Sequence, residues 1–252
     1  MTNQIERLLS IMKRLRDPET GCEWDRAQTF ATIAPYTIEE AYEVHDAIER
    51  SDLEDLRSEL GDLLLQVVFH AQIAEEEDAF DFHRVAETIS DKMVARHPHI
   101  FGTGTDAHDE TRWEELKAAE RKNAGSDSAV DGVALALPAL LRAQKLQKRA
   151  ARVGFDWPDP EGPKAKILEE IEELENAASE EIEEEAGDLL FAVVNFVRSH
   201  GIDSETALRR ANRKFERRFR AMEDLAAGDF PSLPLDEQER LWRRVKQSEK
   251  PA

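Results

Sequence analysis

The chain lacks long apolar runs and has only one cysteine. No apolar stretch of about 18 residues, the length that spans a bilayer, occurs in its 252 residues. The N-terminal segment has the pattern of an amphipathic helix and lacks the apolar centre of a signal peptide. Cys22 has no second cysteine with which to form an internal disulfide, which is typical of a reducing compartment. These absences predict a cytoplasmic protein without a membrane partner.

Positive charge is also scarce. The chain has 34 Lys and Arg residues against 54 Asp and Glu residues, a formal net charge of −20. Proteins that bind nucleic acids need basic surfaces to neutralise phosphates, so a nucleic-acid partner is not expected. A chain this acidic is better suited to a substrate that arrives with metal ions.

Two acidic pairs in the second half of the chain have helical spacing. Glu170 and Glu173 are three residues apart, and so are Glu185 and Asp188. This spacing places both members of a pair on one helix face. A short break at 177–179 would let the two helices pair antiparallel, and the four carboxylates would then converge.

Converging carboxylates repel one another unless they stay solvated or bind a cation. All four ligands are oxygens, which suits magnesium, manganese or calcium and not zinc or copper. Magnesium held by carboxylates commonly shares a phosphate substrate, so phosphate chemistry is the natural interpretation. The alternative is a solvated acidic helix face, which is common in proteins.

The acidic pattern occurs twice, which weakens that alternative. Glu40 precedes Glu170 by 130 positions (170 minus 40), and Asp62 precedes Asp188 by 126 (188 minus 62). The first cluster also contains Glu43 and Glu59, and the words GDLLLQVV and GDLLFAVV nearly coincide.

A second pair of words repeats in the same order. The spacing of Trp113 and Lys117 recurs in Trp242 and Lys246, at an offset of 129 (242 minus 113). Three features at a near-constant offset indicate a duplicated domain. We expect a first domain over residues 1–123, a polar linker over 124–132 and a second domain over 133–252.

Helix limits follow from caps and apolar periodicity. Helices are expected over 5–15, 82–96, 138–152 and 203–227, with a short one around Trp113. Residues 18–35 are expected to be rich in loop. Capping boxes beginning at Thr37 and Ser51 are expected to open the two acidic helices of the first repeat.

The sequence resembles the MazG nucleoside triphosphate pyrophosphohydrolases. EEAYE…ELGD and EEIEE…EAGD match the EExxE…ExxD pattern of that family, and RLRDPETGCEWDRAQTF, RHPHIFG, RAQKLQKRAARVGFDW and KFERRF are similar to its two-domain bacterial members along nearly the whole chain. The resemblance implies an all-α fold of tandem helical bundles, magnesium dependence (manganese being possible), homodimerisation, and hydrolysis of nucleoside triphosphates to monophosphate and pyrophosphate. It also suggests a role in cleansing the nucleotide pool.

The resemblance extends to nucleotide-binding residues. Lys214 and Arg218 share a helix face four residues apart, and cations are needed to offset triphosphate charge. Surface ion pairs with acids such as Glu216 are the alternative, but the family places triphosphate contacts along KFERR. The nucleotide contacts that the family implies are Lys166, Glu169, Glu184, Lys214, Arg217, Arg218, Trp242 and Lys246.

The two repeats differ at the basic helix. Aligning SDKMVARHP with ANRKFERRF puts Met93 opposite Lys214 and His97 opposite Arg218. We therefore expect the C-terminal domain to carry most or all turnover. The N-terminal domain is expected to bind metal, support the dimer or act weakly.

The working hypothesis is that the C-terminal carboxylates hold magnesium and that a metal-bound water attacks the α-phosphorus. Glu169 or Glu184 could orient or deprotonate that water. One rival is a related all-α enzyme, such as a dimeric deoxyuridine triphosphatase or a phosphoribosyl-ATP pyrophosphohydrolase. Another is a non-catalytic acidic scaffold that binds basic partners.

Overall fold

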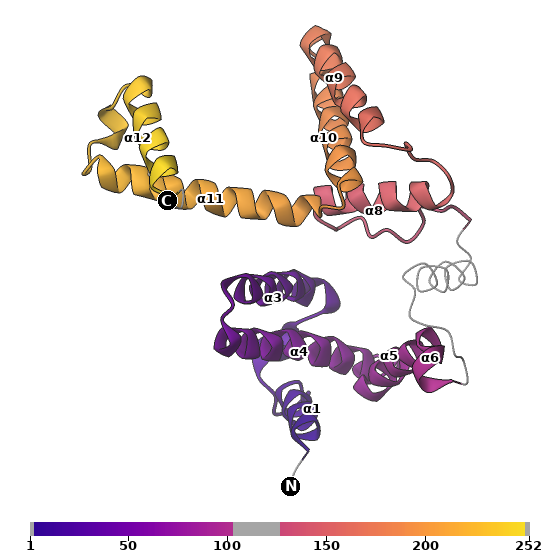
Figure 1. The fold of residues 1–252 in the computed structure, drawn as a ribbon. Coiled ribbons are helices and arrows are strands. Elements are labelled where there is room, and N and C mark those ends of the chain that lie inside the picture. The colour runs from indigo at the N-terminus through magenta and orange to yellow at the C-terminus, as the bar shows by residue number, and fades with distance from the viewer. Residues whose placement is uncertain (1–2, 103–126, 250–252) are drawn as a thin grey trace. The chain divides into compact units, whose positions relative to one another are not determined.

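The computed structural model describes residues 3–102 and 127–249, and these residues form α-helices, one 3₁₀ turn and connecting loops (Figure 1). The chain divides into two compact units, one holding the described residues up to 102 and the other those from 127 onward. The all-α fold is therefore confirmed. Trp113, Lys117 and the start of the expected linker lie outside the described residues.

The first unit contains six described helices. They are α1 (Gln4–Leu15), α2 (Glu23–Ala27), α3 (Phe30–Arg50), α4 (Leu53–Glu76), α5 (Phe82–Arg96) and α6 (Pro98–Phe101). The α3–α4 hairpin carries the first acidic cluster, and α1 and α5 pack against α4 (Figure 1). The expected helices at 5–15 and 82–96 are confirmed.

The expected start of the first acidic helix is wrong. Helix α3 begins at Phe30, where Thr29 and Thr32 form a reciprocal capping box, and it continues through Pro35. Pro35 lies in the second turn, where its missing N–H removes a single helical hydrogen bond. The Thr29–Thr32 cap and packing of Ile33, which is 2% exposed, stabilise the turns that the proline weakens. Helix α2 also lies in the stretch expected to be loop.

The turn between α3 and α4 differs by one residue from expectation. Ser51 ends α3 in the left-handed region with φ of 57°, and Asp52 caps α4 by accepting from the N–H groups of Glu54 and Asp55. The short turn leaves the two helices antiparallel and adjacent.

The core of the first unit joins α1, α3 and α4. Its buried members are Met12, Ile33, Val68, Phe69 and Ile73. The guanidinium of buried Arg16 lies 5.3 Å from the Phe69 ring centroid and pairs with Glu76 at 2.7 Å, which fastens α1 to α4.

The second unit contains five described α-helices and a 3₁₀ turn. They are α8 (Ala139–Arg152), α9 (Glu161–Asn176), α10 (Ile182–Ser199), α11 (Ser204–Leu225), η1 (Phe230–Ser232) and α12 (Leu235–Ser248). The break between α9 and α10 falls where the sequence predicted it, and the two helices form the second acidic hairpin (Figure 1). Helix α8 crosses this hairpin, and the buried Gln144 accepts from the backbone N–H of Ser204, which fixes the start of α11.

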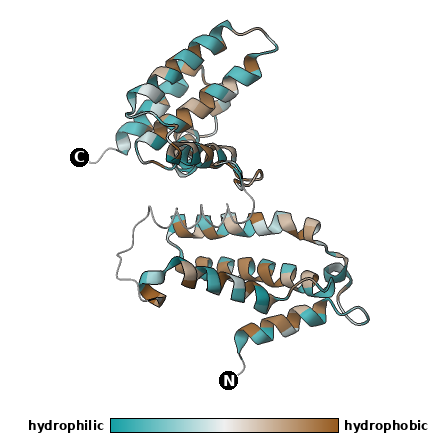
Figure 2. Cartoon of the chain, turned by 90° about the vertical axis from the view of Figure 1, so that its right-hand side faces the viewer, coloured by the Kyte–Doolittle hydropathy of each residue, from teal (hydrophilic) through white to brown (hydrophobic). Residues whose placement is uncertain are grey.

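The far part of the second unit has a core of its own. Met222, Phe230 and Val245 are buried there, with Phe219 and Trp242 packed against them. Helix α11 thus contacts α8 and α10 as well as α12. Figure 2 shows hydrophilic and hydrophobic residues mixed along the helices of both units, as the amphipathic patterns predict. None of the described helices is long and apolar enough to cross a membrane.

Candidate functional site

The two acidic hairpins each bring three carboxylates together. Oxygens of Glu170, Glu173 and Glu185 lie within 4.8 Å of one another, and so do those of the first-repeat residues Glu40, Glu43 and Glu59. Asp62 and Asp188 fall outside these three-residue groups. Asp188 nevertheless lines the same cavity as Glu170.

Glu170 is the buried member of the C-terminal cluster. It is 3% exposed, and its Oε1 lies 2.6 Å from the Lys166 ammonium. Its Oε2 is buried and has no hydrogen-bond partner among the residues that the structure describes. Leaving a buried charged oxygen unpaired costs about 1–3 kcal/mol or more, so this atom indicates a site that a cation completes.

Lys166 supplies the one positive charge of this cluster that the structure shows. Its Nζ pairs with Glu169 at 2.8 Å, Glu170 at 2.6 Å and Glu173 at 3.9 Å. The hydrogen bonds that Lys166 donates to Glu169 and then to Glu170 raise the pKa of Lys166 above its usual value. The 130-residue offset puts Tyr36 at the equivalent position of the first repeat (166 minus 130), so that cluster has no matching lysine.

Electrostatic repulsion is visible in the C-terminal cluster. Desolvation, followed by the charges of Glu173 and Glu170, raises the pKa of the Glu185 carboxyl. Nearby negative charge and desolvation both make ionisation of Glu185 less favourable than that of an isolated glutamate.

The N-terminal cluster shows the same effect. Desolvation raises the pKa of Glu40, with Asp62 the next contributor, and desolvation followed by Glu43 raises that of Glu59. Both clusters thus have the electrostatics of a cation site.

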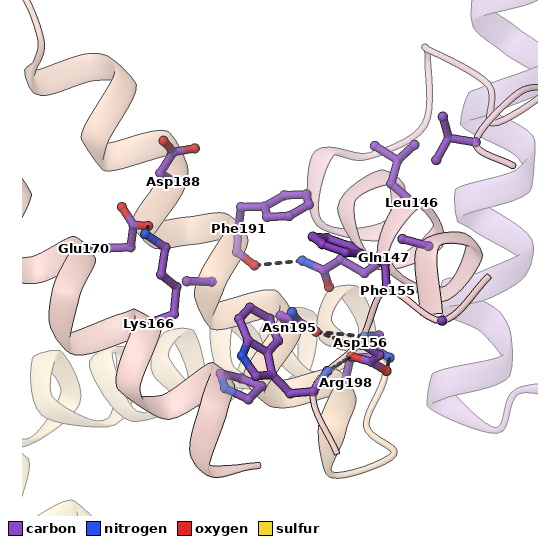
Figure 3. A pocket seen from close by; sticks show the side chains of 16 residues that line it. Leu146, Gln147, Phe155, Asp156, Lys166, Glu170, Asp188, Phe191, Asn195 and Arg198 are labelled. Carbon is purple, nitrogen blue, oxygen red and sulfur yellow. Dashed lines mark hydrogen bonds and ion pairs between the residues drawn. The ribbon is translucent and has the colours of Figure 1, made fainter. Parts of the chain in front are cut away.

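A cavity adjoins the C-terminal cluster, whereas no described cavity is lined by the carboxylates of the N-terminal cluster. It has a volume of about 710 Å³, lies between α8, α9 and α10, and includes Lys166, Glu170 and Asp188 in its wall (Figure 3). This volume is in the range of small-molecule sites. A smaller cavity of about 220 Å³ in the first unit is lined by residues of α1, α4 and α5 and by none of the first cluster's carboxylates.

Apart from Trp157, which the sequence marks either as a packing residue or as a cover for a nucleobase, the residues of the cavity wall were not predicted from the sequence. Three kinds of side chain form this wall. They are the aromatic residues Phe155, Trp157 and Phe191, the amides Gln147 and Asn195, and the ion pair of Asp156 with Arg198. A signal was present: Asn195 interrupts the apolar run LLFAVVNFV at the position where the first repeat has Phe69 (195 minus 126).

An ion pair ties the loop before α9 to α10. Arg198 Nη2 lies 2.6 Å from Asp156 Oδ1, and Arg198 Nη1 donates to Asp156 Oδ2 at 3.0 Å. The hydrogen bond from Arg198 lowers the pKa of Asp156 below its usual value. The same guanidinium donates from Nε to Asn195 Oδ1 at 3.0 Å, so the wall of the cavity is held rigidly.

The predicted triphosphate cations lie elsewhere in the second unit. Arg217 and Arg218 pair with Glu249 at 2.9 and 2.8 Å, and Arg218 lies 5.4 Å from the Trp242 ring centroid. Lys214 is exposed on α11 and Lys246 on α12. Within the described residues no ion pair joins these cations to the four carboxylates, so one chain does not bring the two predicted groups together. Glu216, the expected alternative partner, pairs with Arg220.

The fold and the site define an all-α protein with two clusters of paired carboxylates, one of which opens onto a cavity. The MazG nucleotide pyrophosphohydrolase domain matches residues 28–101 and 160–222, which contain both clusters. The nucleoside triphosphate pyrophosphohydrolase of Escherichia coli K12 is 51% identical over 259 residues, covering 98% of each chain. The nucleoside triphosphate pyrophosphohydrolase/pyrophosphatase MazG of Thermotoga maritima is 46% identical over 245 residues, covering 96% of this chain and 95% of its own. The chain belongs to the MazG family.

Proposed function

We propose that the C-terminal repeat hydrolyses nucleoside triphosphates to monophosphate and pyrophosphate by attack of water on the α-phosphorus. By family membership and the activity named for its relatives, the protein is a nucleoside triphosphate pyrophosphohydrolase. The observation that carries the assignment to this repeat is the unpaired, buried Oε2 of Glu170 in a carboxylate cluster that opens onto the cavity.

The donor set fits a hard divalent cation, for which we propose Mg²⁺, with Mn²⁺ as a substitute. Glu170, Glu173, Glu185 and Asp188 would hold it, and all offer oxygen. When bound, the ion supplies charge neutralisation for the triphosphate and lowers the pKa of a coordinated water.

Lys166 holds the carboxylates in register through its contacts with Glu169, Glu170 and Glu173. Because its charge competes with a cation, we propose that its ammonium turns from the carboxylates to a phosphate oxygen when substrate binds. Glu169 is engaged by Lys166, whereas Glu184 is exposed in the first turn of α10, which favours Glu184 as the group that orients the water.

We also propose a homodimer. Large apolar side chains outside the cavity wall are exposed on the α9–α10 hairpin, namely Leu168, Ile171, Ile182, Leu190 and Val193. A second copy would cover them. A dimer also offers a second source of α11 and α12, and hence of the proposed triphosphate contacts Lys214, Arg217, Arg218, Trp242 and Lys246.

We propose that the N-terminal repeat turns over little substrate. Tyr36 stands where the C-terminal cluster has Lys166, and Phe69 stands where the cavity has Asn195. Its cluster retains the electrostatics of a cation site, so metal binding and support of the dimer are the roles proposed for it.

The test is product analysis with ATP, dTTP and Mg²⁺ for two matched double variants. Glu170→Gln/Glu173→Gln should lower turnover at least about 100-fold, because each lost electrostatic contact in such a site costs several kcal/mol. Glu40→Gln/Glu43→Gln should retain it within about threefold, since this pair lies outside the proposed catalytic repeat. The reverse result would place catalysis in the first repeat.

The products discriminate the rivals. Monophosphate plus pyrophosphate supports attack at the α-phosphorus, whereas diphosphate plus phosphate would move the attack to the γ-phosphorus. Turnover confined to dUTP or phosphoribosyl-ATP would favour one of the related pyrophosphohydrolases. Absence of turnover on every triphosphate would leave the acidic scaffold as the better account.

A further inference from the structure

We infer that the cavity between α8, α9 and α10 receives the nucleobase, and that the amides of Gln147 and Asn195 hydrogen-bond its polar edge. The inference rests on the proposed function, which places the triphosphate at the carboxylates. Lys166, Glu170 and Asp188 lie at one side of this cavity and the two amides at the other (Figure 3). A nucleotide with its phosphates at the carboxylates would extend its base toward the amides.

The orientation of the Gln147 amide is fixed by its partner. Gln147 is 5% exposed and donates from Nε2 to the backbone carbonyl of Phe191 at 2.9 Å. A carbonyl only accepts, so Nε2 must face it and Oε1 must face the other way. That Oε1 is buried, and no residue within 3–102 or 127–249 gives it a hydrogen bond. It is an acceptor that a ligand N–H would satisfy.

The orientation of the Asn195 amide is fixed in the opposite sense. Asn195 is 8% exposed, and its Oδ1 accepts from Arg198 Nε at 3.0 Å. A guanidinium only donates, so Oδ1 must face Arg198 and Nδ2 must face away. The ion pair with Asp156 holds Arg198 in place. Asn195 Nδ2 has no hydrogen-bond partner among the described residues and is available as a donor.

One acceptor and one donor in an apolar cavity suit a nucleobase. Each common base has an N–H donor next to an acceptor on one edge, as in the N3–H and C4 carbonyl of uracil or the N6 amino group and N1 of adenine. The aromatic side chains of Phe155, Trp157 and Phe191 suit a flat ring. A purely apolar ligand would leave Gln147 Oε1 and Asn195 Nδ2 without partners. Because the donor–acceptor pattern is shared, the cavity should accept several bases.

The first repeat provides an internal comparison. At an offset of 126, Phe69 replaces Asn195 and Gln66 replaces the cavity residue Ala192. Phe69 and Gln66 are 4% and 8% exposed, and Phe69 packs into the core against Met12. In the first repeat, protein side chains therefore fill the space that corresponds to the cavity of the second repeat. The site for a base is a property of the second repeat.

The experiment compares a nucleoside triphosphate with a base-free analogue that has the same phosphates. UTP and 1-deoxyribose 5-triphosphate are assayed with Mg²⁺ for wild type, Gln147→Ala and Asn195→Ala. Each variant should lower kcat/KM for UTP roughly 3- to 10-fold, the effect of one neutral hydrogen bond. Neither should change kcat/KM for the base-free analogue. The matched control is Asn176→Ala, an exposed amide at the end of α9 outside the cavity wall, which should leave both substrates unaffected.

A second variant copies the first repeat. Asn195→Phe should fill the cavity and lower kcat/KM for UTP more than Asn195→Ala does, while hydrolysis of the base-free analogue persists. That persistence would show that the variant is folded and that its carboxylate site is intact.

Two outcomes would overturn the inference. An equal loss on both substrates would mean that the amides support the carboxylate site and do not contact a base. If Trp242→Ala lost the preference for UTP over the base-free analogue while Asn195→Ala kept it, the base would lie against α12.

Failure of the proposed function is distinguishable. If wild type hydrolyses neither compound, calorimetric binding of a non-hydrolysable α,β-imido nucleotide to wild type and Asn195→Phe still tests the cavity. Binding lost in the variant supports the base site, and equal binding refutes it.

Discussion

At the scale of single residues, the C-terminal cluster differs from its N-terminal counterpart mainly in its balance of charge. Lys166 contacts three glutamates, and the equivalent position of the first repeat is Tyr36. A positive side chain among carboxylates holds them close before a metal arrives. In the function proposed above, the metal displaces this ammonium from the carboxylates.

Replacement of Lys166 by an uncharged residue is expected to change the thermal stability of the protein. Lys166→Met removes the charge and keeps the length of the side chain, so the carboxylates repel without relief. Thermal unfolding in EDTA should show a lower Tm than wild type, and saturating Mg²⁺ should narrow the difference because the ion replaces the lost charge. The neighbouring exposed Lys164→Met is the control, since Lys164 pairs with Glu161 outside the cluster. A Tm difference that Mg²⁺ leaves unchanged would contradict this role.

The raised pKa of Glu185 predicts a pH dependence. A carboxyl with a higher pKa in the folded than in the unfolded state binds more protons when folded, so stability increases as pH falls toward its unfolded value of about 4.5. The Tm of the metal-free protein should therefore rise as the pH is lowered from 7 to 5.

Net negative charge contributes to the same trend, so the informative comparison is with Glu185→Gln. The variant should show a smaller change of Tm between these pH values. The acids with lowered pKa, such as Asp156 and Glu249, lose their contribution only at lower pH. An identical slope in wild type and variant would mean that Glu185 does not titrate in this window.

At the scale of elements, the start of α9 is packed against the loop that precedes it. A Cβ added at Gly162 would lie 2.0 Å from Trp157 Cδ1, whereas one added at Gly61 within α4 would meet nothing within 4 Å. Glycine at position 162 therefore allows the indole to lie over the first turn of α9, at the wall of the cavity.

These two glycines form a matched pair for mutation. Gly162→Ala should destabilise the protein by about 1–3 kcal/mol, the usual effect of overpacking, and should raise KM by displacing Trp157. Gly61→Ala should stabilise it by up to about 1 kcal/mol, because alanine is favoured in a helix interior. Denaturant unfolding and steady-state kinetics measure both. Equal effects of the two substitutions would contradict the packing of Trp157 on α9.

At the scale of the whole molecule, the helices leave much apolar surface uncovered. On the α9–α10 hairpin, Leu168 and Leu190 are each 59% exposed. Exposed leucines that cluster on one helical hairpin are typical of a surface that another chain covers.

The proposed dimer predicts a mass of twice the 28.7 kDa of one chain in light scattering. Leu168→Arg/Leu190→Arg should lower the mass toward the monomer, because two buried charges would face each other across a symmetric interface. Leu235 on α12 is 72% exposed in the wild-type protein, and Leu235→Arg serves as the control. An unchanged mass in the double variant would place the interface on another surface.

The sequence by itself determined the helical class, the duplication and the two acidic clusters, because each depends on spacing along one chain. Residues three apart share a helix face whatever the rest of the fold does. It also predicted the break between α9 and α10. It misplaced the start of α3, where the Thr29–Thr32 cap and the packing of Ile33 outweigh the signal of Pro35.

Only the tertiary structure decided which polar side chains are buried around the cavity. Gln147, Glu170 and Asn195 come from three helices, and their burial depends on how α8 packs across α9 and α10. The structure also pairs Arg217 and Arg218 of α11 with Glu249, a contact that the sequence had not predicted. The cavity and its unpaired amides arise from contacts between residues far apart in the chain, and such contacts leave no fixed spacing in the sequence.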